Sequence, residues 1–85
     1  RAHAAEGRWA AAIAHYEETL RLSPHSALFH AEIGQIHERS GGRRAALGRY
    51  VEALRRAPGL AQACRGIERV RGDTPPPPES AACPR

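Results

Sequence analysis

Apolar residues recur every three or four positions through most of the chain, as they do on one face of an amphipathic helix. Tyr16 and Leu20 follow this spacing, and Tyr50 and Leu54 repeat it further along the chain. Glycines and prolines interrupt the pattern where helices would end. The pattern predicts an all-α fold with helices at about residues 9–22, 27–39, 43–56 and 60–71, and with residues 1–6 as the end of an incomplete preceding helix.

The chain also repeats itself when it is shifted by roughly 34 residues, a period typical of a two-helix repeat. The two glycines of the repeat are expected in turns where a positive φ favours glycine, and the two prolines are expected to end the second helix of each unit. The two alanines are expected where neighbouring helices approach closely. The residues that coincide under the shift are Gly7 with Gly41, Ala12 with Ala46, Tyr16 with Tyr50, Leu20 with Leu54, and Pro24 with Pro58.

With these residues the chain resembles the tetratricopeptide repeat family over about residues 1–71. In the one complete unit the family pattern is met by Ile33 and Gly34 in the first helix, while His30 and His37 stand where the family usually has tryptophan and tyrosine. The resemblance implies antiparallel helix pairs stacked as a right-handed α-solenoid, with about one complete and two partial repeats. The structural repeat positions are then Gly7, Ala12, Tyr16, Pro24, Gly34, Gly41, Ala46, Tyr50, Ala53 and Pro58.

The last repeat helix, residues 60–71, resembles the first helix of a third unit and is expected to cap the array. Because repeat arrays usually need about three units, we expect N-terminal sequence, self-association or a larger assembly to complete the fold. The repeat segment then covers residues 1–72. Residues 73–85 contain four consecutive prolines and no apolar period, so we expect a disordered tail that serves as a linker or, alternatively, as a ligand for a polyproline-binding domain.

Composition limits the chemistry. Cys64 and Cys83 are too few and too irregularly placed to define a disulfide framework, so we expect reduced cysteines in an intracellular setting. No apolar run approaches the roughly 18 residues of a membrane span, and we expect no membrane insertion. The five histidines lack zinc-ligand spacing, and His3, His30 and His37 are expected to replace aromatic packing residues. We therefore expect no metal, no cofactor and no enzyme.

The resemblance implies that the first helix of each unit lines a concave groove. The expected groove surface is polar and net positive, and forked guanidinium groups suit carboxylates, so we expect an acidic peptide partner. Glu32, Gln62 and Gly66 break the pattern that would grip chaperone tails. The groove residues are Leu28, Gln35, Glu38, Arg39, Gln62, Arg65 and Arg69.

Two other functions stay open. The chain has a formal net charge of +4, and all of its basic residues are arginine. Nucleic-acid binding is nevertheless disfavoured, because the arginines within residues 43–56 spread around their helix, Glu52 interrupts them, and no aromatic group for base stacking lies among them. Alternatively, the array is a structural segment of a larger assembly.

Overall fold

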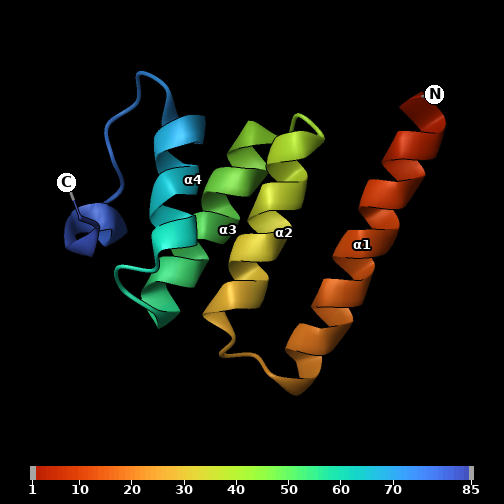
Figure 1. The fold of residues 1–85 in the computed structure, drawn as a ribbon, viewed down its shortest axis with the longest axis horizontal. Helices are drawn as coiled ribbons and strands as arrows, with labels where there is room; N and C mark the ends of the chain where they lie inside the picture. Colours follow the sequence, from red (N-terminus) through yellow and green to blue (C-terminus); the bar gives the residue numbers. More distant parts are fainter. Residues whose placement is uncertain (1, 85) are drawn as a thin grey trace.

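The computed structural model describes the backbone of residues 2–84 and the side chains of residues 7–84. Four α-helices and a short 3₁₀ helix follow one another, and residues 2–84 contain no strand, which confirms the all-α prediction. In Figure 1, α2, α3 and α4 pack side by side, and α1 stands on the other flank of α2. The elements are α1 (Ala2–Leu22), α2 (Ala27–Arg39), α3 (Arg43–Arg56), α4 (Ala61–Arg71) and η1 (Pro78–Ala82).

Helix α1 is continuous, which contradicts the predicted turn at Gly7 and the separate helix over residues 1–6. The φ of Gly7 is not positive, and a side chain added there would meet nothing within 4 Å. Glycine permits a turn but does not impose one, and the surrounding stretch is rich in alanine, the strongest helix former. The helix therefore runs through Gly7 for 21 residues.

The turns that bound α2 form as the sequence indicated. Ser26 caps its start by accepting a hydrogen bond from the backbone N–H of Phe29 at 3.3 Å. At its end Gly41 has a φ of 92°, and the N–H of Gly42 donates to the carbonyl of His37 at 2.7 Å, the bond that closes a Schellman turn. Helices α2 and α3 consequently occupy the ranges read from the sequence.

The core is centred on Tyr50, whose side chain is fully buried between two glycines. A methyl group added at Gly34 would lie 3.0 Å from the Tyr50 ring, and one added at Gly66 would lie 2.3 Å from it. Gly34 was recognised as a repeat position, whereas the packing role of Gly66 was not. The remaining buried members of this cluster are Ala31, Ala46, Ala53, Leu54, Ala63, Cys64, Ile67 and Val70.

The other repeat positions differ in burial. On α1, Ala12 and Tyr16 are only half-buried, whereas Ala46 and Ala53 on α3 are fully buried. Both turn prolines, Pro24 and Pro58, are exposed just beyond the ends of α1 and α3.

The C-terminal segment, residues 73–84, folds back onto the helices, which contradicts the predicted disordered tail. Cys64 and Cys83 form a disulfide with a Cα–Cα distance of 5.7 Å, so the expectation of reduced cysteines is also wrong. Helix η1 contacts α3, where Arg55 and Glu79 form an ion pair of 3.1 Å. An apolar period cannot reveal this arrangement, because one covalent bond and one ion pair anchor the segment.

Candidate functional site

The predicted groove residues lie on α2 and α4, which contact each other, and we call this set of seven residues the α2–α4 surface. The Gln62 amide donates to Gln35 Oε1 at 3.4 Å. Arg69 donates to both carboxylate oxygens of Glu38, with Nε 2.7 Å from Oε2 and Nη2 3.1 Å from Oε1. The structure thus brings four of the predicted residues together in two cross-helix pairs, which form a polar seam between the helices.

Glu38 also connects the surface to the core. The hydroxyl of Tyr50 donates to Glu38 Oε1 at 2.7 Å. Hydrogen bonds from Arg69, and secondarily from Tyr50, lower the pKa of Glu38 against the opposing effect of its burial. Burial, together with the Glu38 carboxylate, raises the pKa of Tyr50 to about 12. Glu38 is therefore an ionised acceptor whose oxygens are already engaged.

Two arginines of the surface are differently placed. Arg39 and Arg65 are exposed, and neither forms an ion pair with another of the described side chains. Leu28, at the start of α2, is 49% exposed and offers an apolar contact on the same surface. Because Glu38 and Arg69 neutralise each other, the seven residues of the surface keep a net charge of +2 at neutral pH, which Arg39 and Arg65 carry.

A cleft that the sequence did not reveal lies beside Arg65. It has a volume of about 820 Å³ and separates α4 from the C-terminal segment. Ala61, Cys64 and Arg65 belong to the α4 wall, and Pro76 and Ala81 belong to the opposite wall. Its size falls in the range of small-ligand and peptide side-chain sites. We call it the C-terminal cleft; a cysteine on the apolar face of α4 and a second one in the tail were the only sequence signals for it.

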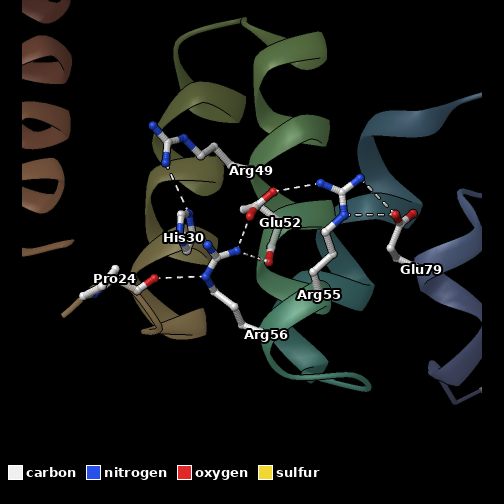
Figure 2. A network of polar contacts seen from close by, with 7 residues as sticks. All are labelled: Pro24, His30, Arg49, Glu52, Arg55, Arg56 and Glu79. Atoms are coloured by element: carbon white, nitrogen blue, oxygen red, sulfur yellow. Dashed lines mark hydrogen bonds and ion pairs between the residues drawn. The ribbon is translucent and has the colours of Figure 1, made fainter. Parts of the chain in front are cut away.

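Three arginines of α3, Arg49, Arg55 and Arg56, take part in a polar network that Figure 2 shows in close-up. Arg56 donates to the carbonyl of Pro24 at 3.0 Å and pairs with Glu52, which precedes it by four residues on α3. Arg55 bridges Glu52 and Glu79, the latter in the C-terminal segment. The network therefore ties the α1–α2 turn, α3 and η1 together.

Glu17 and Arg21 stand four residues apart on α1 but do not form an ion pair. Arg21 pairs instead with Glu18 at 3.0 Å, while Glu17 reaches across to Arg49 on α3 at 2.8 Å. Arg49 also lies 3.2 Å from Nδ1 of His30. Glu17 pairs with Arg49 rather than with Arg21, because Arg49 lies close to both Glu17 and His30.

His30 and His37 pack as the sequence suggested, His30 buried and His37 half-buried. Burial, followed by the charges of Arg56 and Arg49, lowers the pKa of His30. Burial and Arg49 likewise lower the pKa of His37. Both rings therefore favour the neutral form, and protonating them below about pH 6.5 favours the unfolded chain. The side chain of His3 lies outside the described residues.

Within the described part of the chain, no three histidine, cysteine, aspartate or glutamate side chains are grouped as metal ligands. None of the helices in that part is long and apolar enough to cross a membrane.

Comparison with known families adds one finding. Residues 1–41, which include α1 and α2, match the family model described as TPR repeat. Comparisons with curated proteins and with solved structures give no significant match. Repeats of this kind are typically non-catalytic modules that mediate protein–protein interaction. The match supports the resemblance seen in the repeated glycine, alanine, tyrosine and proline positions, and residues 1–41 are similar to a TPR repeat.

Proposed function

We propose that this protein binds a carboxylate-bearing segment of a partner protein on the α2–α4 surface. The observation that carries the proposal is the contrast between paired and unpaired charges on that surface. Arg69 is fixed by Glu38, whereas Arg39 and Arg65 are exposed without an ion pair among the described side chains. Exposed guanidinium groups on a rigid helical frame suit carboxylates, because their planar donors match the two carboxylate oxygens.

The seam supports this role by fixing the surface in advance. The Gln35–Gln62 and Glu38–Arg69 contacts hold α2 against α4, so the spacing between the two exposed arginines is set before a partner arrives. A preorganised surface loses less conformational entropy on binding. Leu28 would then receive an apolar side chain of the bound segment.

The α3 arginines favour a protein partner over nucleic acid. Arg49, Arg55 and Arg56 are each engaged by a carboxylate of the same chain. Phosphate binding would have to compete with these contacts, and base stacking would need aromatic groups that do not lie among them. These three arginines therefore offer little free positive charge to a nucleic acid.

The test is a pull-down with quantitative mass spectrometry, comparing wild type with Arg39→Glu plus Arg65→Glu. The matched control is Arg8→Glu plus Arg44→Glu, which makes the same change of charge at exposed positions on α1 and α3. We expect partners with acidic segments to be lost from the first variant and kept by the control. Unchanged partners in the first variant would remove the α2–α4 surface as the binding site.

A direct measurement should follow with an acidic peptide taken from a captured partner. Its affinity for wild type should fall with salt and should fall further on replacing its glutamates by glutamine. Equal affinity of the acidic and amide peptides would contradict the proposed carboxylate recognition.

A further inference from the structure

The C-terminal segment is held in place by very few contacts. Its covalent anchor is the Cys64–Cys83 disulfide, and the polar anchor of η1 is the ion pair between Arg55 and Glu79 (Figure 2). The other polar contacts with the helices lie at the start of the segment, where the Thr74 hydroxyl and N–H donate to the Arg71 carbonyl and the Arg71 guanidinium donates to the Thr74 carbonyl. The ion pair contributes little, because the Arg55 side chain is 58% exposed and water competes for it, although the Glu79 side chain is only 24% exposed. Removing the disulfide would therefore leave the segment without an effective anchor.

The C-terminal segment has few backbone groups that could bind it to the helices. Prolines at positions 75–78 have no backbone N–H, so this stretch cannot donate a backbone hydrogen bond to α4. Helix η1 is a 3₁₀ helix of 5 residues, a form that is stable only in short pieces with support from its surroundings. Its internal bonds, such as Cys83 N–H to the Ser80 carbonyl at 2.9 Å, are local. The position of the segment thus depends on the disulfide.

The same segment forms one whole wall of the C-terminal cleft. Pro76, Ser80, Ala81, Cys83 and Pro84 line that wall, opposite α4. Arg65 lies on the α4 wall and also belongs to the α2–α4 surface. The α4 wall also contains Glu68 and Arg69, so the apolar part of the cleft lies between Ala61, Cys64 and the C-terminal segment. A carboxylate held by Arg65 therefore has this apolar part beside it, but only while the segment is folded back.

We propose that the Cys64–Cys83 disulfide is a redox switch that builds the C-terminal cleft as an extension of the peptide-binding surface. In the disulfide form, a bound segment places a carboxylate at Arg65 and an adjacent apolar side chain in the cleft. In the dithiol form, the wall is lost while Arg65 and the α2–α4 surface remain. The ligand class in this inference rests on the proposed function, whereas the movement of the segment does not.

The switching step is an exchange with a dithiol reductant. A thiolate of the reductant attacks the sulfur of Cys83, which is the accessible one because Cys83 is half-buried and Cys64 is only 7% exposed. A mixed disulfide forms and Cys64 leaves as a thiolate, which takes up a proton. The second thiol of the reductant then displaces Cys83, giving two protein thiols and one oxidised reductant. Cys64 stays buried as a small apolar side chain.

Release of the segment is tested by ¹⁵N relaxation of wild type with and without dithiothreitol, and of Cys83→Ser. We expect the heteronuclear NOE of residues 79–83 to be helix-like only in the disulfide form, and to fall to values of a mobile chain in the other two samples. The NOE values of α2 and α3 should stay unchanged in all three. Ordered residues 79–83 in the Cys83→Ser variant, or loss of α2 and α3 on reduction, would overturn the switch.

Binding is tested by fluorescence polarisation with a labelled hexapeptide of alternating leucine and glutamate. We expect the disulfide form to bind about tenfold more tightly than the reduced form, since partial burial of one apolar side chain has this effect on a dissociation constant. Equal affinity of both forms, with loss of binding in Arg39→Glu plus Arg65→Glu, would overturn the switch and keep the proposed function. No binding by the disulfide form would overturn the coupling to this ligand class, and the relaxation data would still decide the movement.

Discussion

The two flanks of α2 are built in different ways. On one flank, α3 and α4 enclose a contiguous core around Tyr50, and the disulfide holds the C-terminal segment against them. On the other flank stands α1, the longest helix, which has a single buried residue, Leu20, among its described side chains (Figure 1). Among the described side chains, the longest helix therefore contributes the fewest buried residues of the four α-helices.

Few contacts hold α1 against the rest of the molecule. The rings of Tyr16 and Phe29 lie 5.7 Å apart, and Glu17 reaches Arg49 on α3. The placement of α1 depends on this small set, whereas α3 contacts both α2 and α4. We expect the free energy of unfolding to be concentrated in α2, α3 and α4.

The largest expected effect concerns the glycine that packs on the Tyr50 ring. In Gly66→Ala the new methyl group would lie 2.3 Å from a fully buried ring, so the core must shift. Overpacking of this kind costs about 2 kcal/mol even after the better helix propensity of alanine is counted. Urea unfolding followed by circular dichroism should show the loss.

The matched control is Gly48→Ala, another helical glycine, which has open space around it. It should keep or raise the free energy of unfolding, by up to about 1 kcal/mol. Equal stability of the two variants would show that the core around Tyr50 accommodates a methyl group. The α3–α4 flank would then be less tightly packed than its contrast with the α1 flank requires.

A smaller effect is expected at alkaline pH. The folded chain holds the Tyr50 proton up to a pKa of about 12, whereas the unfolded chain releases it near the ordinary value of 10.0. Above pH 10 the unfolded state therefore binds fewer protons, and the free energy of unfolding decreases, by about 1 kcal/mol at pH 11. Urea unfolding at pH 9 and pH 11 measures this difference.

Tyr50→Phe provides the comparison for the alkaline experiment. It removes the hydrogen bond to Glu38, which costs about 1 kcal/mol at neutral pH, and it also removes the titrating group. The variant should lose less stability between pH 9 and pH 11 than wild type does. An equal loss in both proteins would place the alkaline sensitivity elsewhere in the chain.

The parts of the fold that the sequence predicted are those governed by local chemistry. A positive φ at Gly41 and a capping hydroxyl at Ser26 are each specified within a few residues, so the bounds of α2 followed from them. Gly7 failed as a turn signal because glycine only permits a turn, and the alanine-rich surroundings favoured helix. The close approach of Gly66 to Tyr50 depends on how α4 sits over α3, which no local pattern contains.

The candidate site likewise contains residues that the sequence predicted and features that it could not predict. The resemblance to tetratricopeptide repeats predicted Gln35, Glu38, Gln62 and Arg69 on helices that line one groove, and the structure joins them in pairs. Spacing could not reveal that Glu38 neutralises Arg69, since that depends on the distance between two helices. The C-terminal cleft depends on a bond between residues separated by 19 positions, in a tail with no apolar period. Nothing local signals a closure of that kind.

The smallest expected effect tests the weakly held flank directly. In Glu17→Gln the tether to Arg49 is lost, and an ion pair at a half-exposed site contributes about 0.5 kcal/mol. Trp9 is the only tryptophan and lies on α1, so its fluorescence reports this helix, whereas circular dichroism reports mainly the others. We expect the fluorescence transition in urea to move to lower concentration while the dichroism transition moves less. Glu18→Gln is the control, because Glu18 pairs with Arg21 inside α1 and does not reach α3. If each variant shifts the fluorescence and dichroism transitions by the same amount, α1 unfolds together with the core. The two flanks would then differ in how many residues they bury but not in stability.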